Sequence, residues 1–266
     1  MQTVTCEDLV LAFQRLNIVP GDIVITHSSL KSFGQVVGGA DSVIDALQLC
    51  VGETGTLVFP TLVQHNFERA YETWDKDKSP SDVGLISETF RLRPGVLRSD
   101  QATHSIAALG PAAAELVADH GAYGLRDGPF GQTPFAWASP WQKLYFCRAK
   151  ILFLGVTMLY NTFKHLIEYC LAEYRVERIC DPERRAAALA ELERFNHPGV
   201  WLWINAEQIE RMLEENGLLS RTTCGASRLT TCRADTCFDI TFAAVLAHPE
   251  DWLKEAALDW WQRYSI

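Results

Sequence analysis

Residues 22–60 read DIVITHSSLKSFGQVVGGADSVIDALQLCVGETGTLVFP, and this stretch decides the fold. The apolar run Ile23–Ile25 predicts a short buried strand, and Gly55–Pro60 predicts a second one. Between them lie a glycine-bearing loop and a helix, which Asp41 or Ser42 can cap and which carries Val43, Ile44, Ala46, Leu47 and Val51. The order strand, helix, strand predicts a parallel βαβ unit.

The rest of the chain continues this alternation. Strands are predicted at 105–109 and 150–154, with at most two more at 221–239. Helices are predicted at 6–16, 85–92, 111–120, 161–173, 183–195, 206–216 and 250–264. Residues 62–82 and 121–140 look irregular, and a loop as long as the first is often a binding loop. We therefore expect one α/β domain over residues 1–266, with a largely parallel central sheet and helices on both faces.

Composition narrows the class of protein. The 266 residues are 48% hydrophobic, which excludes disorder as the main state, and no apolar run approaches the length of a membrane span. A formal charge of −9 argues against a nucleic-acid partner. The first residues show neither the basic nor the apolar part of a signal peptide, so we expect a cytoplasmic protein with reduced cysteines. Cys224, Cys232 and Cys237 cluster without any CxxC pair, so no metal site is predicted.

The loop after the first predicted strand is a candidate anion site. His27-Ser28-Ser29-Leu30 leads through Val37-Gly38-Gly39 into a helix, so small hydroxyls, backbone N–H groups and a helix N-terminus come together. Such a loop can bind a pyrophosphate, although it is neither a Walker A loop nor a GxGxxG loop. The alternative is an ordinary turn between a strand and a helix.

Two histidines are candidates for acid–base work. His104 follows Arg98-Ser99 just before an apolar strand, and its spacing fits a structural role better than a chemical one. His165 and Glu168 lie three residues apart and share one helix face. A carboxylate there raises the imidazole pKa and fixes its tautomer, as a general base requires. The alternative is a surface ion pair. No GxSxG elbow is present, and Cys170 lies on a different helix face from His165, so a nucleophile mechanism is disfavoured.

Several motifs in order resemble the aminoglycoside N3-acetyltransferase family, acetyl-CoA-dependent enzymes unrelated to the common GNAT acetyltransferases. These motifs are His27–Leu30, Val37–Ala40, Val51–Leu57, Pro80–Arg91, Pro94–Ser99, Leu154–Val156 and the Asn-Thr-x-x-His-x-x-Glu segment at Asn161–Glu168. The resemblance covers residues 5–175, and beyond residue 180 it is loose.

The resemblance implies direct acetyl transfer from acetyl-CoA to an amine, most often the 3-amino group of an aminoglycoside. His165 inherits the role of catalytic base, with Glu168 in support and Glu210 as a second candidate carboxylate. Asn161, Ser105 or a backbone N–H near Gly155 could donate to the developing oxyanion. The coenzyme would contact His27, Ser28, Ser29, Leu30, Val37, Gly38, Gly39, Arg98 and Ser99, and a polycationic acceptor would meet Glu72, Asp75 and Asp77.

Two departures leave other functions open. The family usually has x-His-Pro after Arg-Ser, where this chain has Asp100-Gln101-Ala102, and its loop at 62–82 is short. Another small amine from natural-product, siderophore or amino-sugar biosynthesis is therefore an alternative acceptor. A non-catalytic binding protein is a second alternative, and a metal-dependent hydrolase using His27, His104 and His165 is a third. The oligomeric state, including a homodimer, is open.

Overall fold

A computed structural model describes residues 3–63, 69–120, 134–135, 138–195 and 202–265. Most of the irregular segment expected at 121–140 lies outside these ranges. No helix within the described ranges combines the length and the apolar character needed to cross a membrane.

The centre of the described structure is a seven-stranded sheet with the order β5-β6-β4-β2-β7-β9-β8. The strands are β2 (Ile23–Ser28), β4 (Thr56–Pro60), β5 (Leu97–Arg98), β6 (Ile106–Leu109), β7 (Lys150–Leu154), β8 (Ser220–Cys224) and β9 (Ser227–Arg233). The three central strands are parallel, and β2, the helix α2 (Gly39–Val51) and β4 form the predicted βαβ unit. The α/β class is confirmed.

The expectation of a largely parallel sheet is wrong. β6 pairs antiparallel with β4 and β5, and β9 pairs antiparallel with β7 and β8. The β8–β9 pair is a hairpin whose turn contains Gly225 at φ +56°, so no crossover helix separates these strands. The parallel pairing is thus confined to the middle of the sheet.

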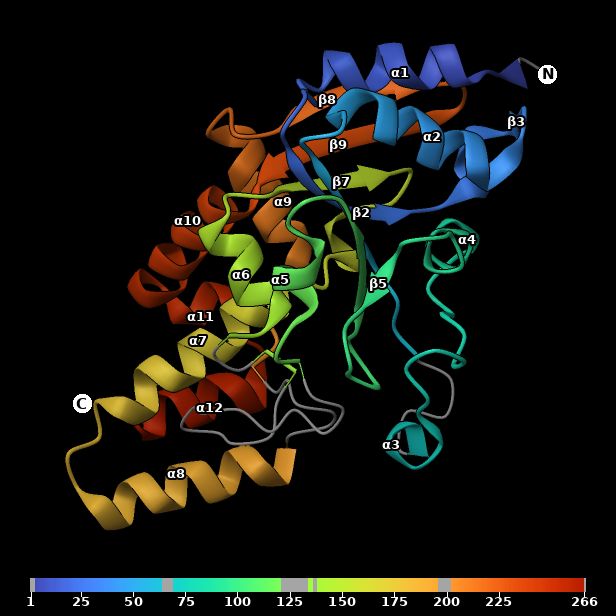
Figure 1. The fold of residues 1–266 in the computed structure, drawn as a ribbon. Helices are drawn as coiled ribbons and strands as arrows, with labels where there is room; N and C mark the ends of the chain where they lie inside the picture. The colour runs from blue at the N-terminus through green and yellow to red at the C-terminus, as the bar shows by residue number, and fades with distance from the viewer. Residues whose placement is uncertain (1–2, 64–68, 121–133, 136–137, 196–201, 266) are drawn as a thin grey trace.

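Helices cover both faces of the sheet (Figure 1). Alternate residues of each central strand point to opposite faces, as pleating requires. Val24, Leu57 and Leu152 share a core with α1 (Cys6–Arg15), α2 and α4 (Leu85–Arg91). Ile25, Val58 and Ile151 share the other core with α5 (Ala113–Val117), α6 (Pro140–Phe146), α7 (Lys164–Glu177) and α10 (Ala234–Ala247).

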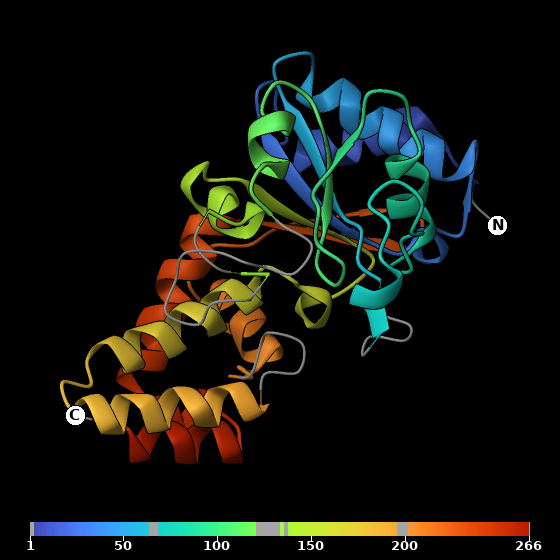
Figure 2. The same ribbon diagram turned by 60° about the horizontal axis from the view of Figure 1, so that its bottom comes forward.

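A group of C-terminal helices extends the second core. Figure 2 shows α8 (Pro182–Phe195) lying along α12 (Glu255–Arg263), and the Trp260 indole donates to the Ala188 carbonyl at 3.3 Å. α11 (Pro249–Trp252) packs against α10 and α12, and α9 (Ala206–Glu215) packs against α10. The predicted helix at 250–264 is therefore two helices, separated where Leu253 forms a bridge with Ile204.

The remaining described elements are short: β1 (Thr3–Val4), which pairs with β3 (Gln35–Val36), and α3 (Ala70–Thr73), together with 3-10 turns at Leu30–Phe33 and Met158–Tyr160. The predicted helix starts at residues 6, 85 and 206 are confirmed, and others differ from the prediction. α2 begins before Asp41, with Gly38 as its N-cap at φ +76°, and α7 begins at Lys164 because the 3-10 turn occupies the preceding residues. The helix α10 was missed because its sequence is apolar on most faces and shows no stripe.

Candidate functional site

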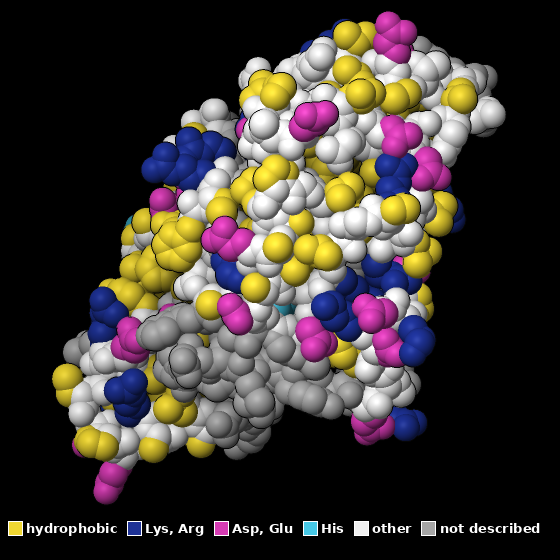
Figure 3. Space-filling model, in the orientation of Figure 1, with side chains coloured by type: hydrophobic (Ala, Val, Ile, Leu, Met, Phe, Trp, Pro, Cys, Tyr) yellow, Lys and Arg dark blue, Asp and Glu magenta, His cyan; other side chains and the backbone are white. Residues whose placement is uncertain are grey.

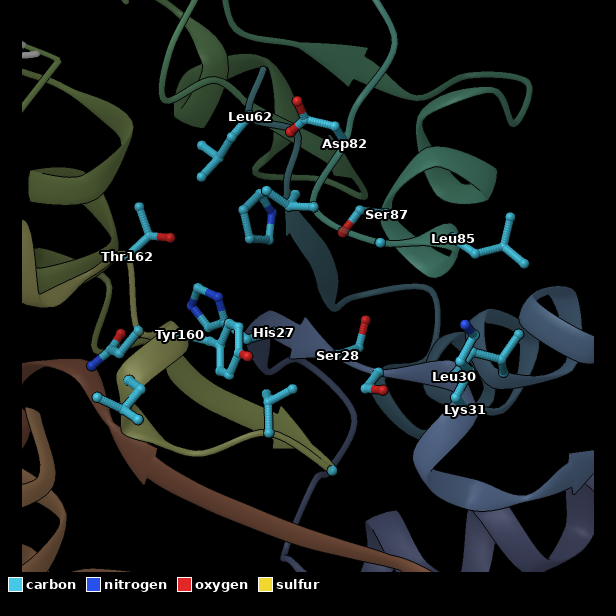
Figure 4. A pocket seen from close by; sticks show the side chains of 18 of the residues that line it. His27, Ser28, Leu30, Lys31, Leu62, Asp82, Leu85, Ser87, Tyr160 and Thr162 are labelled. Carbon is cyan, nitrogen blue, oxygen red and sulfur yellow. The ribbon is translucent and has the colours of Figure 1, made fainter. Parts of the chain in front are cut away.

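A cavity of about 770 Å³ opens at the carboxyl ends of the parallel strands, the edge where open α/β sheets bind their ligands. Adjacent parallel strands end at the same edge, so the residues after β2, β4 and β7 meet there. Figure 4 shows side chains from separate segments bounding the cavity: His27 and Ser28 from β2, Tyr160 and Thr162 from the turn after β7, Leu62 after β4, Asp82 before α4 and Ser87 within α4.

His165 lines this cavity, and Glu168 lies beneath it. His165 Nδ1 lies 2.5 Å from Glu168 Oε2, and the carboxylate has no solvent exposure. Because the carboxylate accepts at Nδ1, the neutral ring carries its proton there and leaves Nε2 as a lone pair. The pair is thus a buried hydrogen bond at the cavity wall and not a solvated surface pair.

The pKa of His165 is lower than the sequence analysis expected. Burial of the ring lowers the pKa below its ordinary value, Glu168 opposes the shift, and Lys164 adds to it. His165 and Lys164 together hold the pKa of Glu168 below its usual range, against the effect of burial. The ring is therefore neutral at neutral pH, and the carboxylate is ionised.

Lys164 is a residue of this site that the sequence analysis missed. Its Nζ lies 2.7 Å from Glu168 Oε1 and 3.4 Å from His165 Nδ1. The signal was its position one helical turn before Glu168, at i,i+4. The Trp203 ring covers both groups, with its centroid 4.6 Å from Lys164 Nζ and 5.6 Å from the His165 ring. Nothing in the sequence near Trp203 indicated this contact.

His104 lines the cavity on another side of His165, with ring centroids 6.0 Å apart. Its Nδ1 lies 2.9 Å from the Thr103 hydroxyl, and its ring packs edge-on against Phe135. Burial and the neighbouring His165 and His120 lower the pKa of His104 well below its ordinary value. His104 is thus a neutral, closely packed wall of the cavity, and it borders the ligand space.

His27 and Ser28 supply buried polar atoms without protein partners. The His27 ring stacks on Phe153 at 5.4 Å, and burial, with His165 nearby, lowers its pKa to about 3. The His27 Nε2 and Ser28 Oγ atoms have no hydrogen-bond partner, and both residues line the cavity together with Ser29, Leu30 and Lys31. A buried unpaired polar atom costs about 1–3 kcal/mol, so these atoms indicate a place for ligand groups.

Two of the predicted oxyanion donors are already engaged. The Gly155 N–H donates to the Arg228 carbonyl at 2.9 Å, and the Ser105 hydroxyl donates to the Thr61 carbonyl at 2.9 Å. Asn161 is buried at the cavity, and its Oδ1 accepts from the Phe163 N–H at 3.1 Å, while its amide nitrogen reaches the Met158 sulfur at 3.6 Å. Asn161 therefore holds the turn before α7 and keeps donor capacity.

Arg98 and Ser99 do not line the cavity. Arg98 is buried under the Trp74 ring and donates to the Thr61 carbonyl at 2.6 Å and to the Lys76 carbonyl at 3.1 Å. Ser99 Oγ accepts from the Ile106 N–H at 2.9 Å. The geometry thus gives both residues a structural role, which ties the segment at 74–79 to β5 and β6.

The predicted loop at 37–39 also lies away from the cavity. Val37 is exposed and donates its N–H to the Val4 carbonyl at 2.9 Å, which extends the pairing of β1 with β3. Gly38 and Gly39 form the left-handed entry to α2. Only the first half of the expected coenzyme loop, at 27–30, reaches the cavity.

The acidic residues expected to bind an acceptor lie away from the cavity, and the carboxylates of Glu72 and Asp75 pair with neighbouring basic residues. The Glu72 carboxylate accepts from Arg69 at 2.8 Å, and the Asp75 carboxylate accepts from Lys78 at 2.7 Å. At Asp77 it is the backbone carbonyl that accepts from Arg91, at 3.0 Å. None of these three lines the cavity, whereas Asp82 does. Asp82 was missed, although it lies inside the Pro80–Arg91 motif.

Glu210 does not contact His165 in the described hydrogen bonds. Its Oε1 pairs with Arg228 at 2.8 Å and Arg221 at 3.2 Å, and its Oε2 accepts from the Met158 N–H at 3.3 Å. Glu210 therefore fixes the turn before α7 from outside, and Glu168 is the carboxylate that contacts the imidazole. The two carboxylates have separate roles.

The three cavity histidines do not converge as metal ligands. Among the described residues, the group with metal-ligand spacing is His248, Glu250 and Asp251, all exposed and far along the chain. The eight cysteines are free thiols, and Cys170 is a partly buried one whose pKa burial raises to about 12. The geometry disfavours both the hydrolase and the thiol mechanisms.

Comparison with known proteins gives one consistent family. Residues 25–245 match the family model described as aminoglycoside 3-N-acetyltransferase. Aminoglycoside N(3)-acetyltransferase IX of Micromonospora chalcea is 33% identical over 187 residues, which are 64% of this chain and 63% of that protein. Aminoglycoside N(3)-acetyltransferase IV of a Salmonella species is 31% identical over 176 residues, 65% of this chain and 62% of the relative. The matches thus span less than two thirds of these relatives.

Solved structures share the fold. The AAC-IIIb structure in binary complex with coenzyme A aligns with a TM-score of 0.70 at 20% identity, covering 94% of this chain and 98% of that one. The YokD protein of Bacillus subtilis has a TM-score of 0.70 at 21% identity, covering 94% and 96%. Sisomicin-bound AAC-VIa has a TM-score of 0.69 at 22% identity, covering 93% and 99%.

Proposed function

The chain belongs to the aminoglycoside 3-N-acetyltransferase family, and we propose that it transfers the acetyl group of acetyl-CoA to an amino group of a small molecule, specifically the 3-amino group of an aminoglycoside. The observation that carries this proposal is the buried His165–Glu168 pair at the wall of a large cavity. Relatives named for this activity, and neighbours with bound coenzyme A or sisomicin, support the choice of both substrates.

His165 is the general base of the proposed reaction. Its Nε2 removes a proton from the acceptor amine, the amine nitrogen forms a bond to the acetyl carbon, and the carbon–sulfur bond breaks. The imidazolium then returns the proton to the departing thiolate, so the products are an amide and a free thiol. A positioned base of this kind contributes about 10²–10⁴-fold to the rate. Glu168 fixes the ring orientation and stabilises the imidazolium.

The residues at 27–31 suit the acetyl thioester end and the phosphates of the coenzyme. The unpartnered His27 Nε2 and Ser28 Oγ can donate to a carbonyl oxygen, and Lys31 supplies a positive charge at the same cavity. His27 stays neutral, with a pKa of about 3, so it donates without repelling a cationic acceptor. Together with Asn161, these donors can stabilise the negative charge that develops on the acetyl oxygen.

Asp82, His104 and Tyr160 line the space that we assign to the acceptor. One carboxylate in this lining is consistent with a cationic amine, since a nearby anion stabilises an ammonium group. Amines other than aminoglycosides remain alternative acceptors, because Glu72, Asp75 and Asp77 do not line the cavity. We place the protein in the cytoplasm as one domain that binds no nucleic acid. On the face seen in Figure 3, acidic and basic side chains are intermixed without one basic patch.

An acceptor panel tests this function. Free thiol release from acetyl-CoA is measured with aminoglycosides, hydroxyornithine-like amines and amino sugars, and mass spectrometry locates the acetyl group. We expect turnover with a deoxystreptamine aminoglycoside at its 3-amino group. For such a polycation, KM should rise with salt, since exposed charges are screened over about 8–10 Å. Turnover only with monoamines, at a KM that salt leaves unchanged, would replace the acceptor class. No turnover with any amine, despite coenzyme binding, would favour the non-catalytic alternative.

A further inference from the structure

Lys164 stands in an unusual place for a lysine. Its side chain is 5% exposed, it lies next to His165 in sequence, and it bonds to Glu168 Oε1 at 2.7 Å. The other oxygen of that carboxylate contacts His165 Nδ1. Lysine and imidazole thus share one carboxylate, and their nitrogens lie 3.4 Å apart.

Lys164 changes what protonation of His165 does to the net charge of this cluster. Without the lysine, His165 and Glu168 would carry a net charge of −1 that protonation of the ring neutralises. With the lysine, the cluster is neutral, and the same proton produces a buried net charge of +1. Like charges within a few ångströms disfavour the protonated form. Lys164 therefore opposes the proton that Glu168 attracts.

In the part of the chain that the structure describes, Glu168 and the Trp203 ring are the main contacts of the Lys164 ammonium group. The Ile204 N–H also donates to Glu168 Oε1 at 2.9 Å, and the Trp203 ring covers Lys164 Nζ. The other titratable groups near His165 among the described residues are His104 and His27, and burial keeps both neutral. Phe135 and Trp203 also contact the His165 ring. Lys164 and Glu168 are thus the two charges that face the imidazole.

We propose that Lys164 is a positioning residue that sets the proton affinity of His165 by competing with it for the Glu168 carboxylate. This inference rests on the proposed function, because the proton affinity of His165 matters for catalysis only if His165 is the base. A base weakened in this way is neutral over a wider pH range. Its imidazolium also returns the proton more readily to a departing thiolate, since the conjugate acid of a weaker base is a stronger acid.

The test reads His165 directly, without either substrate. The pKa of His165 is followed by NMR titration of the histidine side chains, with His165→Gln identifying the signal. Lys164→Gln keeps a hydrogen-bond donor and removes the charge, so we expect the His165 pKa to rise by about one pH unit or more. Lys164→Arg keeps the charge and should leave the pKa near the wild-type value. The acid limb of kcat/KM should move by the same amounts.

Lys150→Gln is the matched control. Lys150 forms an ion pair of the same length, 2.7 Å, with Asp22, at the opposite end of the parallel strands. The Lys150→Gln substitution should leave the His165 pKa unchanged. If Lys164→Gln does not fold, as judged by circular dichroism, Lys164→Met removes the same charge with an apolar side chain of similar length.

The two possible failures are distinguishable. An unchanged or lowered His165 pKa in the folded Lys164→Gln or Lys164→Met protein would overturn this inference, and so would an equal rise in Lys150→Gln. Loss of the proposed function would show instead as no acetyl transfer by the wild type, whatever the titration gives.

Discussion

The three histidines that line the cavity are kept neutral by burial, and this has a consequence for stability. The folded-state pKa of His27 is about 3, against an ordinary value of 6.5, so the unfolded chain binds a proton first as pH falls. The contribution of His27 to the free energy of unfolding is complete above pH 6.5 and is lost as pH falls toward 3. The slope from this one group reaches about 1.4 kcal/mol per pH unit.

His27→Gln should therefore flatten the acid dependence of stability. We expect the free energy of unfolding, measured by urea titration between pH 7 and pH 5, to fall less steeply in the variant than in the wild type. His248→Gln, at an exposed position, is the control and should keep the wild-type slope. An identical slope for all three proteins would show that His27 takes up its proton in the folded state near its ordinary pKa.

Residue by residue, the sequence predicted the site only where the chemistry was local. His165 and Glu168 could be paired because three residues on a helix lie on one face. Arg98 could not be placed, since its partners come from other segments. Glu72 and Asp75 pair with Arg69 and Lys78, only three residues away, and their spacing did not show that they lie away from the cavity. The contact between His165 and Trp203 depends on how α7 and the segment before α9 pack together, and no spacing in the sequence encodes it.

At the scale of elements, the turn after β7 brings the site together. Gly155 has φ +66° and lies against the Ser32–Ser227 hydrogen bond, so an added Cβ would come within 1.8 Å of Ser32 Oγ and 2.7 Å of Ser227 Oγ. Gly39 has a similar φ of +61°, and its Cβ would meet nothing within 4 Å. Both glycines therefore have a left-handed backbone, but only at Gly155 would an added Cβ also overlap neighbouring atoms.

Gly155→Ala should destabilise the protein more than Gly39→Ala. The left-handed conformation costs about 1–2 kcal/mol for any L-residue, and overpacking at Gly155 adds about 1–3 kcal/mol. Urea unfolding of the two variants measures the difference. Equal losses would mean that Ser32 and Ser227 move aside freely and that the turn is not closely packed.

The strands show why the sheet could be predicted only in part. The apolar runs at 23–25, 56–60 and 150–154 identify buried strands, and the helix between the first two requires a parallel pair. The direction of β6 and β9 depends on which strand each one reaches after a long excursion of the chain. Periodicity carries no information on that choice, so a largely parallel sheet was predicted where the flanks are antiparallel.

On the scale of the whole molecule, the fold accounts for the position of His165 at the cavity. Three parallel strands end at one edge, α7 begins beside that edge, and His165 in its first turn lines the cavity there. The central claim is that His165 is the base for acetyl transfer and that the coenzyme binds independently of it. His104, which borders the same cavity and packs on Phe135, is the matched control.

The most direct measurement is kcat for acetyl transfer in His165→Gln and His104→Ala, with the affinity for coenzyme A measured by calorimetry in each protein. We expect His165→Gln to lower kcat by about 10²-fold or more while coenzyme binding stays nearly intact. His104→Ala should cost less and should act through packing or acceptor orientation. If His104→Ala abolishes turnover and His165→Gln does not, the base is the other histidine, and the mechanism proposed for this cavity is wrong.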